Sequence, residues 1–402
     1  MPGNINIRMY NVGFGDCFLV TLPTSDGDRK ILIDCGSIKK KKKSIEDIAK
    51  QVIKDVTVDG KARIDVLVLS HRHEDHLSGF AKKVWGEVEV GEVWMPWVES
   101  PTDPAARRIR NELAATARNL RVAATLLGLD ENRIGAVALN ALSDEGALGT
   151  LHRGFKGEPE RRFFPKSKTA VVEEIKTPLL PGIDIFVMGP PHDDTALNDP
   201  DPPQGQSLLT GFSANPDGAS AGEKFQPFGE GWIEEFPPML DDRQQINEAA
   251  SMVAAYELAA AKLDADINNT SLILLFRIGD EYLLFPGDAQ WGPWELALGD
   301  AEAVELLEKV TFLKVSHHSS HNGTPASLLR DIIGKNNAHN GVVQAMVSMT
   351  PKKGWEGIPH EPILTLLTER NFPFCVSDRA EDNPPGPFVR NGTLCYDLDI
   401  PV

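Results

Sequence analysis

Cysteine is scarce in this sequence, with four residues in a chain of 402. All four lie within apolar runs and lack the spacing of a zinc motif, so we expect buried, reduced thiols and no disulfide framework. They are Cys17, Cys35, Cys375 and Cys395. No apolar run approaches the 18 residues that suggest a membrane span, and the start of the chain lacks the apolar segment of a signal peptide. We therefore expect a soluble, cytoplasmic protein that has no membrane partner.

Positive charge is also in deficit, because 41 lysines and arginines face 58 aspartates and glutamates, a net charge of −17. This balance argues against broad, non-specific binding of nucleic acid, although a local cationic site can still attract an anionic substrate. The charge is unevenly distributed. Residues 101–168 carry a net charge of +4 and residues 191–250 a net charge of −10. The run Lys39–Lys43 is either a solvated surface feature or a set of phosphate contacts.

The most informative motif is His71-Arg72-His73-Glu74-Asp75-His76, which follows the apolar run from Ile64 to Leu69. Such a run predicts a strand buried on both faces, so the motif lies in the loop that leaves the strand. In an extended loop, His71 and His73 point to the same side and can share one metal ion. Asp75 and His76, at the start of the next helix, can reach a second ion. Imidazole and carboxylate ligands suit Zn²⁺ or Mn²⁺, and two such ions form a hydrolytic site.

Three further motifs each place a polar residue at the end of a predicted strand. Asp34 is expected to accept a hydrogen bond from a ligand histidine, and Asp288 can bridge two ions. His317 is expected to be a metal ligand because it is the first histidine after its strand. His318 can then contact the substrate or move a proton, although the sequence also allows the reverse assignment. We expect Asp75 and His318 to be the catalytic side chains.

The ordered set Asp34, His71–His76, Asp288 and His317 resembles that of the metallo-β-lactamase-fold hydrolases. A narrower resemblance is to the C-terminal domain of the competence DNA-uptake channel, the ComEC-like branch. It is carried by three stretches, residues 12–17 (VGFGDC), 269–272 (NTSL) and 313–318 (LKVSHH). The resemblance covers roughly residues 5–95 and 183–402. The chain departs from the branch where His-His-Gly-Ser is usual, because Ser319 and Ser320 follow the histidine pair here.

The resemblance implies a further histidine ligand between the first motif and Asp288. His192 occupies that interval, after a predicted strand at residues 183–190, and is the candidate for this sixth ligand. The alternatives are that His192 is an ordinary loop histidine, or that no side chain serves in this position.

The alternation of predicted strands and helices in two halves favours an α/β (α+β) fold, a four-layer αββα sandwich. The motifs converge on one site, so we expect a single domain over residues 1–402. It carries a basic helical insertion at about 101–168 and an acidic, Pro/Gly-rich insertion at about 191–240. Strands are predicted near residues 5–13, 18–23, 30–35, 64–70, 92–96, 183–189, 271–279, 281–287, 311–316, 342–349, 373–378 and 393–400. Helices are predicted near residues 44–56, from His76, and near 103–127, 241–263, 325–333 and 361–370.

The resemblance and the lysine run favour a dinuclear metal-dependent phosphodiesterase or nuclease, in which a hydroxide bridging two Zn²⁺ or Mn²⁺ ions attacks phosphorus. The expected partner is an anionic phosphodiester, nucleic acid included. Two alternatives stay open from the sequence. One is hydrolysis of a carbon ester, lactone or amide, and the other is a partner-regulated protein with little turnover, which binds another protein through the acidic insertion.

Overall fold

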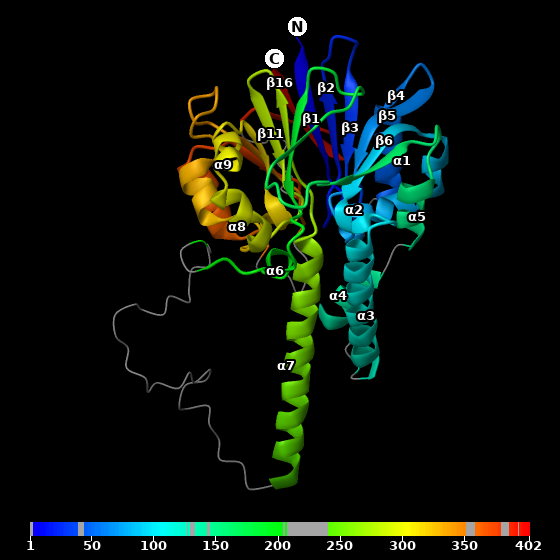
Figure 1. Cartoon of the computed structure of the whole chain (residues 1–402), viewed down its shortest axis with the longest axis vertical. Coiled ribbons are helices and arrows are strands. Elements are labelled where there is room, and N and C mark those ends of the chain that lie inside the picture. Colours follow the sequence, from blue (N-terminus) through cyan, green and yellow to red (C-terminus); the bar gives the residue numbers. More distant parts are fainter. Residues whose placement is uncertain are drawn as a thin grey trace.

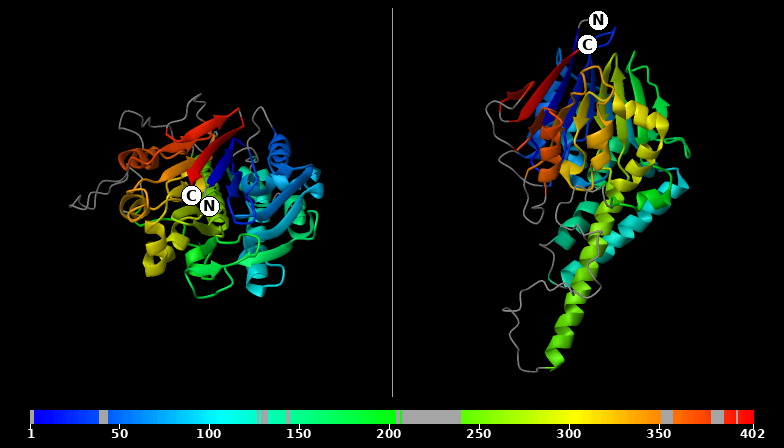
Figure 2. Two further views of the ribbon diagram at one scale, coloured as in Figure 1. Left: turned by 90° about the horizontal axis from the view of Figure 1, so that it is seen from above. Right: turned by 90° about the vertical axis from the view of Figure 1, so that its left-hand side faces the viewer.

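Two β-sheets pack face to face in the computed structural model, and helices cover their outer faces (Figure 1, Figure 2). The structure describes residues 3–38, 44–126, 128, 133–142, 145–203, 206, 240–350, 358–378, 386–392 and 394–402. The lysine run and most of the acidic insertion, residues 207–239, lie outside these ranges. No helix in the described ranges is long and apolar enough to cross a membrane.

The first sheet joins both ends of the chain, because its first and last long strands pair antiparallel along seven residues each. Its order is β15 (Phe388–Asn391), β16 (Cys395–Pro401), β1 (Asn4–Tyr10), β2 (Phe18–Leu22), β3 (Arg29–Ile33), β5 (Lys61–Val68), β6 (Glu89–Pro96) and β7 (Glu160–Phe164), with β4 (Thr57–Val58) paired to β5. The second sheet has the order β14 (Phe374–Val376), β13 (Gln344–Val347), β12 (Phe312–Lys314), β11 (Glu281–Phe285), β10 (Ile273–Ile278), β9 (Asp184–Gly189) and β8 (Glu173–Ile175).

Side-chain alternation along the strands builds three apolar layers. In β2, Phe18 and Val20 face the space between the sheets, whereas Leu19 faces the outer helices. In β5, Val66 faces the space between the sheets and Leu67 faces the outer helices, which explains why the last residues of this strand are apolar on both faces. The predicted αββα sandwich is therefore confirmed.

Helices cover the outer face of each sheet through their apolar sides. On the first sheet these are α1 (Ile45–Asp55) and α5 (Glu145–Arg153). On the second sheet they are α8 (Trp291–Gly299), α9 (Ala301–Glu308) and α10 (Glu361–Glu369). A helix predicted at residues 325–333 is only a single π-helical turn, Leu328–Ile332. The four cysteines are buried and free, as expected.

Three helices form a separate bundle at one end of the sandwich (Figure 1). These are α3 (Pro104–Leu126), α4 (Arg133–Leu142) and α7 (Leu240–Asn268). Leu120, Val137 and Leu263 belong to their shared apolar cluster. The helix predicted at residues 241–263 thus packs on the basic insertion, and the right-hand view of Figure 2 shows it extending far from the sheets. The C-terminal end of α7 reaches the loops that carry the predicted ligands.

Candidate metal centre

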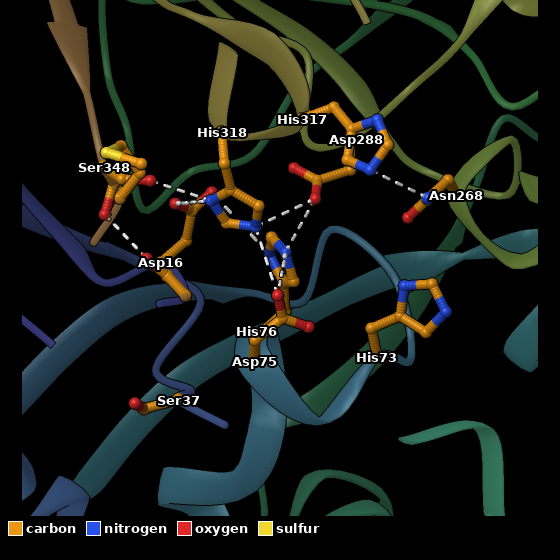
Figure 3. A network of polar contacts seen from close by, with 12 residues as sticks. Asp16, Ser37, His73, Asp75, His76, Asn268, Asp288, His317, His318 and Ser348 are labelled. Carbon is orange, nitrogen blue, oxygen red and sulfur yellow. Dashed lines mark hydrogen bonds and ion pairs between the residues drawn. The ribbon is translucent and has the colours of Figure 1, made fainter. Parts of the chain in front are cut away.

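The predicted ligand loops meet at one edge of the sandwich (Figure 3). β3 and β5 run parallel in the first sheet, and β11 and β12 run parallel in the second. The loops that follow parallel neighbours leave the sheet at the same edge, so each sheet contributes polar residues to one centre. The side chains at this centre are at most 8 % exposed, which means that their charges must be balanced within the protein.

The loop after β5 places two imidazoles against each other. His71 Nε2 lies 3.0 Å from His73 Nδ1. The short helix α2 (Glu74–Leu77) then begins and turns Asp75 and His76 toward the second sheet. His76 donates from Nδ1 to Asp34 Oδ2 at 2.9 Å, so its Nε2 faces the centre. Asp34 thus has the orienting position that was expected of it.

Asp288 links the two halves of the centre. Its Oδ2 lies 3.1 Å from His76 Nε2 and 3.2 Å from His318 Nε2. The same His318 nitrogen is 3.1 Å from Asp75 Oδ2. The potential donor atoms of His71, His76 and Asp288 lie within 4.8 Å of one another, and so do those of Asp75, His76 and His318. Two neighbouring sets of metal-type donors therefore share His76.

The two histidines of the pair exchange their expected positions, because His318 rather than His317 faces the carboxylates. His318 points into the centre and donates from Nδ1 to the carbonyl oxygen of Ser348 at 2.8 Å, which leaves Nε2 toward the carboxylates. His317 lies to one side, with Nε2 3.2 Å from the Asn268 amide nitrogen and Nδ1 3.3 Å from that of Gln290. Both histidines and Ser319 have positive φ angles of 47°, 50° and 66°. This left-handed turn is costly for residues with a Cβ, and it redirects the side chains.

A buried lysine fixes the other oxygen of Asp288. Lys314, the last residue of β12, places Nζ 3.0 Å from Asp288 Oδ1, 2.5 Å from Asp16 Oδ2 and 2.8 Å from the carbonyl oxygen of Gly287. Only Oδ2 of Asp288 is then turned to the imidazoles. Although burial disfavours its charge, the two carboxylates raise the pKa of Lys314. Lys314 is therefore charged at neutral pH.

Glycine allows the first loops to pack against the backbone of α2. A Cβ at Gly36 would lie 2.3 Å from the carbonyl carbon of Asp75, and a Cβ at Gly15 would lie 2.5 Å from its oxygen. In this close approach, the Asp16 amide donates to the carbonyl of Asp75 at 2.9 Å. The VGFGDC stretch therefore holds Asp75 in place and brings Asp16 to Lys314.

The electrostatics of the centre call for additional positive charge. Burial opposes ionisation of Asp75 and Asp288, but neighbouring histidines and Lys314 outweigh it and lower both pKa values. Burial likewise disfavours the charged form of His318, yet Asp288 and Asp16 raise its pKa to about 10. Asp75 Oδ1 also has no hydrogen-bond partner in the described part of the chain. Ionised carboxylates beside histidines that hold protons fit a site where divalent cations supply the charge.

His192 is not brought to this centre. Its ring stacks on Trp97 with centroids 4.1 Å apart, and Nε2 lies 3.0 Å from the carbonyl oxygen of Pro165. It is also absent from every set of adjacent metal-type donors in the described ranges. β9 ends at Gly189. The loop that follows places His192 beside Pro165, the residue after β7 of the first sheet. The geometry supports the alternative in which His192 is a loop histidine.

A buried ion pair fixes the backbone of the first motif. Arg72, between His71 and His73, binds Glu99 through Nε at 2.8 Å and Nη2 at 2.6 Å. Glu99 belongs to the short turn after β6, Trp97–Glu99. Bidentate geometry of this kind fixes orientation as well as charge. The pair therefore holds the backbone between the two imidazoles.

Residues 10–83 match the family model of the metallo-beta-lactamase superfamily. No curated protein matches the chain. The matched stretch runs from β1 past α2 and includes the first motif, whereas Asp288 and His318 lie outside it. Proteins of this superfamily are generally metal-dependent hydrolases, and the His/Asp sets described above could bind metal.

Sequence reasoning missed three residues at the centre: Asp16, Asn268 and Lys314. Two of them carried a usable signal. Asp16 follows a glycine after a strand, just as Asp288 does, and Lys314 is a charged residue within an otherwise apolar strand. Asn268 has no such signal, because its place depends on where α7 ends.

Proposed function

We propose that the protein is a dinuclear metal-dependent phosphodiesterase. The proposed ligands of the two ions form two groups joined by one carboxylate. They are His71 and His73 for the first ion, Asp75, His76 and His318 for the second, and Asp288 between them. This assignment keeps the expected ligand set except that His318 replaces His317 and His192 is left out.

The observation that carries the proposal is the position of Asp288, whose donor atoms lie within 4.8 Å of those of His71 and His76 and whose Oδ2 lies 3.2 Å from His318 Nε2. A single carboxylate oxygen that faces donors from both halves of the fold is suited to bridging two ions. Lys314 supports this by holding Oδ1 at 3.0 Å. Paired ions of this kind supply an activated water and stabilise charge on a reacting phosphate.

The remaining side chains orient the ligands and move protons. Asp34 and the carbonyl of Ser348 fix the tautomers of His76 and His318, so that each presents Nε2 to the centre. His317 is buried beside the centre and forms no contact with Asp75 or Asp288 among the described hydrogen bonds and ion pairs. Burial lowers its pKa below the usual value. We assign it the substrate contact or proton movement that the sequence had suggested for His318.

A cationic cavity at the same sheet edge supports an anionic substrate. Its volume is about 300 Å³, and its lining includes Arg162, Lys166, Lys168, His192 and Trp97. β5, β6 and β7 run parallel and therefore end at the same edge of the sheet. The first ligand loop follows β5, and the cavity residues Lys166 and Lys168 follow β7. Neighbouring strands lie about 4.8 Å apart, which sets the β5-to-β7 separation at roughly 10 Å. A polyanionic substrate such as a nucleic acid has further phosphates for this cavity, and this favours the nuclease proposal.

A substrate panel tests the proposed function. Protein loaded with Mn²⁺ or Zn²⁺ should hydrolyse bis-p-nitrophenyl phosphate and labelled DNA or RNA, and a chelator should abolish both activities. Asp288→Asn should abolish them too, because the shared ligand loses its charge. Cleavage of a chromogenic lactone or lactam, with no diester turnover, would assign the centre to carbon–oxygen or carbon–nitrogen bonds.

The role of the cationic cavity has a separate test. The double variant Lys166→Ser, Lys168→Ser should raise KM for an oligonucleotide and leave that for the small diester nearly unchanged. The salt dependence of oligonucleotide binding should also become shallower, by about 0.7 in log–log slope per lost contact with a single strand. Lys156→Ser is the control, because Lys156 is an exposed lysine near the start of the same strand, β7. Equal effects from both variants would remove the cavity from the substrate path.

A further inference from the structure

The last residue of α7 presents an unexplained polar atom. Asn268 is 1 % exposed, and its amide nitrogen lies 3.2 Å from His317 Nε2. Its oxygen, Oδ1, has no hydrogen-bond partner in the described part of the chain. A buried polar group without a hydrogen-bond partner destabilises the folded protein. An orientation that leaves this oxygen unsatisfied therefore implies a ligand for it.

The surroundings of Asn268 indicate what that ligand is. Figure 3 shows the amide nitrogen turned to His317 and the oxygen turned to the side of the centre where His73 lies. The Asn268 side chain also contacts the ring of His73, and this contact opposes the fall in pKa that burial causes there. One helical turn earlier, Asp264 Oδ1 lies 3.7 Å from His73 Nε2. The end of α7 thus flanks the imidazole whose Nδ1 faces His71.

Without α7, the first ion has fewer proposed ligands than the second. The second group has Asp75, His76 and His318, whereas the first has only the imidazoles of His71 and His73 besides the shared carboxylate. Counting the shared carboxylate, the first ion has three proposed ligands and the second has four. His192, the residue expected to complete the first group, is held against Trp97. A fourth ligand that would match the second ion's set therefore has to come from another element.

We propose that Asn268 Oδ1 is this fourth ligand, so that the long helix beside the insertion completes the metal centre. The inference rests on the dinuclear site proposed above but not on its substrate. An amide oxygen is a harder ligand than an imidazole, which favours Mn²⁺ over Zn²⁺. The first position should consequently be less selective for zinc than it would be with a histidine in the place of Asn268.

Metal content tests this assignment without reference to activity. Asn268→Leu removes the oxygen at similar size, Asn268→Asp retains an oxygen, and Asn268→His offers an imidazole. Gln290→Leu is the matched control, because Gln290 holds the opposite nitrogen of His317 at 3.3 Å. Each protein is stripped, reloaded with Mn²⁺ or Zn²⁺, and assayed by elemental analysis and by competition with a chelator of known affinity.

The expected result is two ions in the wild type, in Asn268→Asp and in Gln290→Leu, but one tightly held ion in Asn268→Leu. The affinity of the weaker ion should fall by more than about 100-fold, beyond the roughly 10–100-fold typical of an outer hydrogen-bond partner. Asn268→His should shift the preference toward Zn²⁺. Full occupancy in Asn268→Leu, or an equal loss in Gln290→Leu, would overturn the assignment. A wild type that binds no metal would instead refute the proposed function.

Discussion

Replacing Lys314 by methionine tests the charge balance at the centre. The lysine side chain is 3 % exposed and lies between two carboxylates, those of Asp16 and Asp288. At an effective dielectric constant of 20, one pair of unit charges 3 Å apart contributes about 5–6 kcal/mol before desolvation is counted. Removing one partner of a buried pair costs about 3–5 kcal/mol. We expect metal-free Lys314→Met to lose stability in that range.

The loss should shrink when metal is bound, because divalent ions beside Asp288 replace the missing positive charge. Urea unfolding followed by circular dichroism, with and without a chelator, measures both values. Lys309→Met is the control, since Lys309 pairs with Glu305 at 2.7 Å on an exposed helix face. Exposed pairs of this spacing contribute only about 0.3–0.5 kcal/mol. The reasoning fails if the two variants are equally destabilised, or if bound metal makes no difference to Lys314→Met.

Three further predictions concern single side chains. His318→Ala should lose at least one ion by elemental analysis, whereas His317→Ala should keep both and turn over about 10²–10⁴-fold more slowly; the opposite pattern would restore the order expected from the sequence. His192→Ala should leave metal content unchanged, and a lost ion would contradict its placement. Although burial opposes the shift, the ion pair with Arg72 lowers the pKa of Glu99. The stabilisation that this pair gives is therefore complete above the unfolded-state pKa of about 4.3, and it disappears as the pH falls through the lower pKa of the folded state. Glu99→Gln should therefore cost about 3–5 kcal/mol at neutral pH and give a flatter profile of unfolding free energy below pH 4.3; an unchanged profile would argue against the pair.

The fold and the first motif could be predicted because their signals are local. Apolar runs such as Ile64–Leu69 mark buried strands, and ligands spaced along one loop, as in His71–His76, follow directly from the backbone path. Short strands were missed where the sequence is charged. β7 (ERRFF) and β8 (EEI) have few apolar residues, and their place in the sheets comes from pairing with β6 and β9.

The rest of the centre depends on geometry that no local pattern contains. The sequence favours His317 as the ligand because it is the first histidine after β12, but in the structure, where residues 317–319 form a left-handed turn, His318 points inward instead. The contact of Lys314 with Asp16 joins residues almost 300 positions apart. Asn268 reaches the centre only because α7 packs on α3 and α4 and ends beside His73.

The most direct test of the account is to titrate metal-free protein with Mn²⁺ or Zn²⁺ and to follow bound metal and hydrolysis of bis-p-nitrophenyl phosphate in the same samples. We predict that binding saturates at two ions per chain, that turnover rises as the second ion binds, and that Asp288→Asn shows neither behaviour. A protein that binds two ions and cleaves no phosphodiester, or one that cannot be loaded at all, would contradict the central claim.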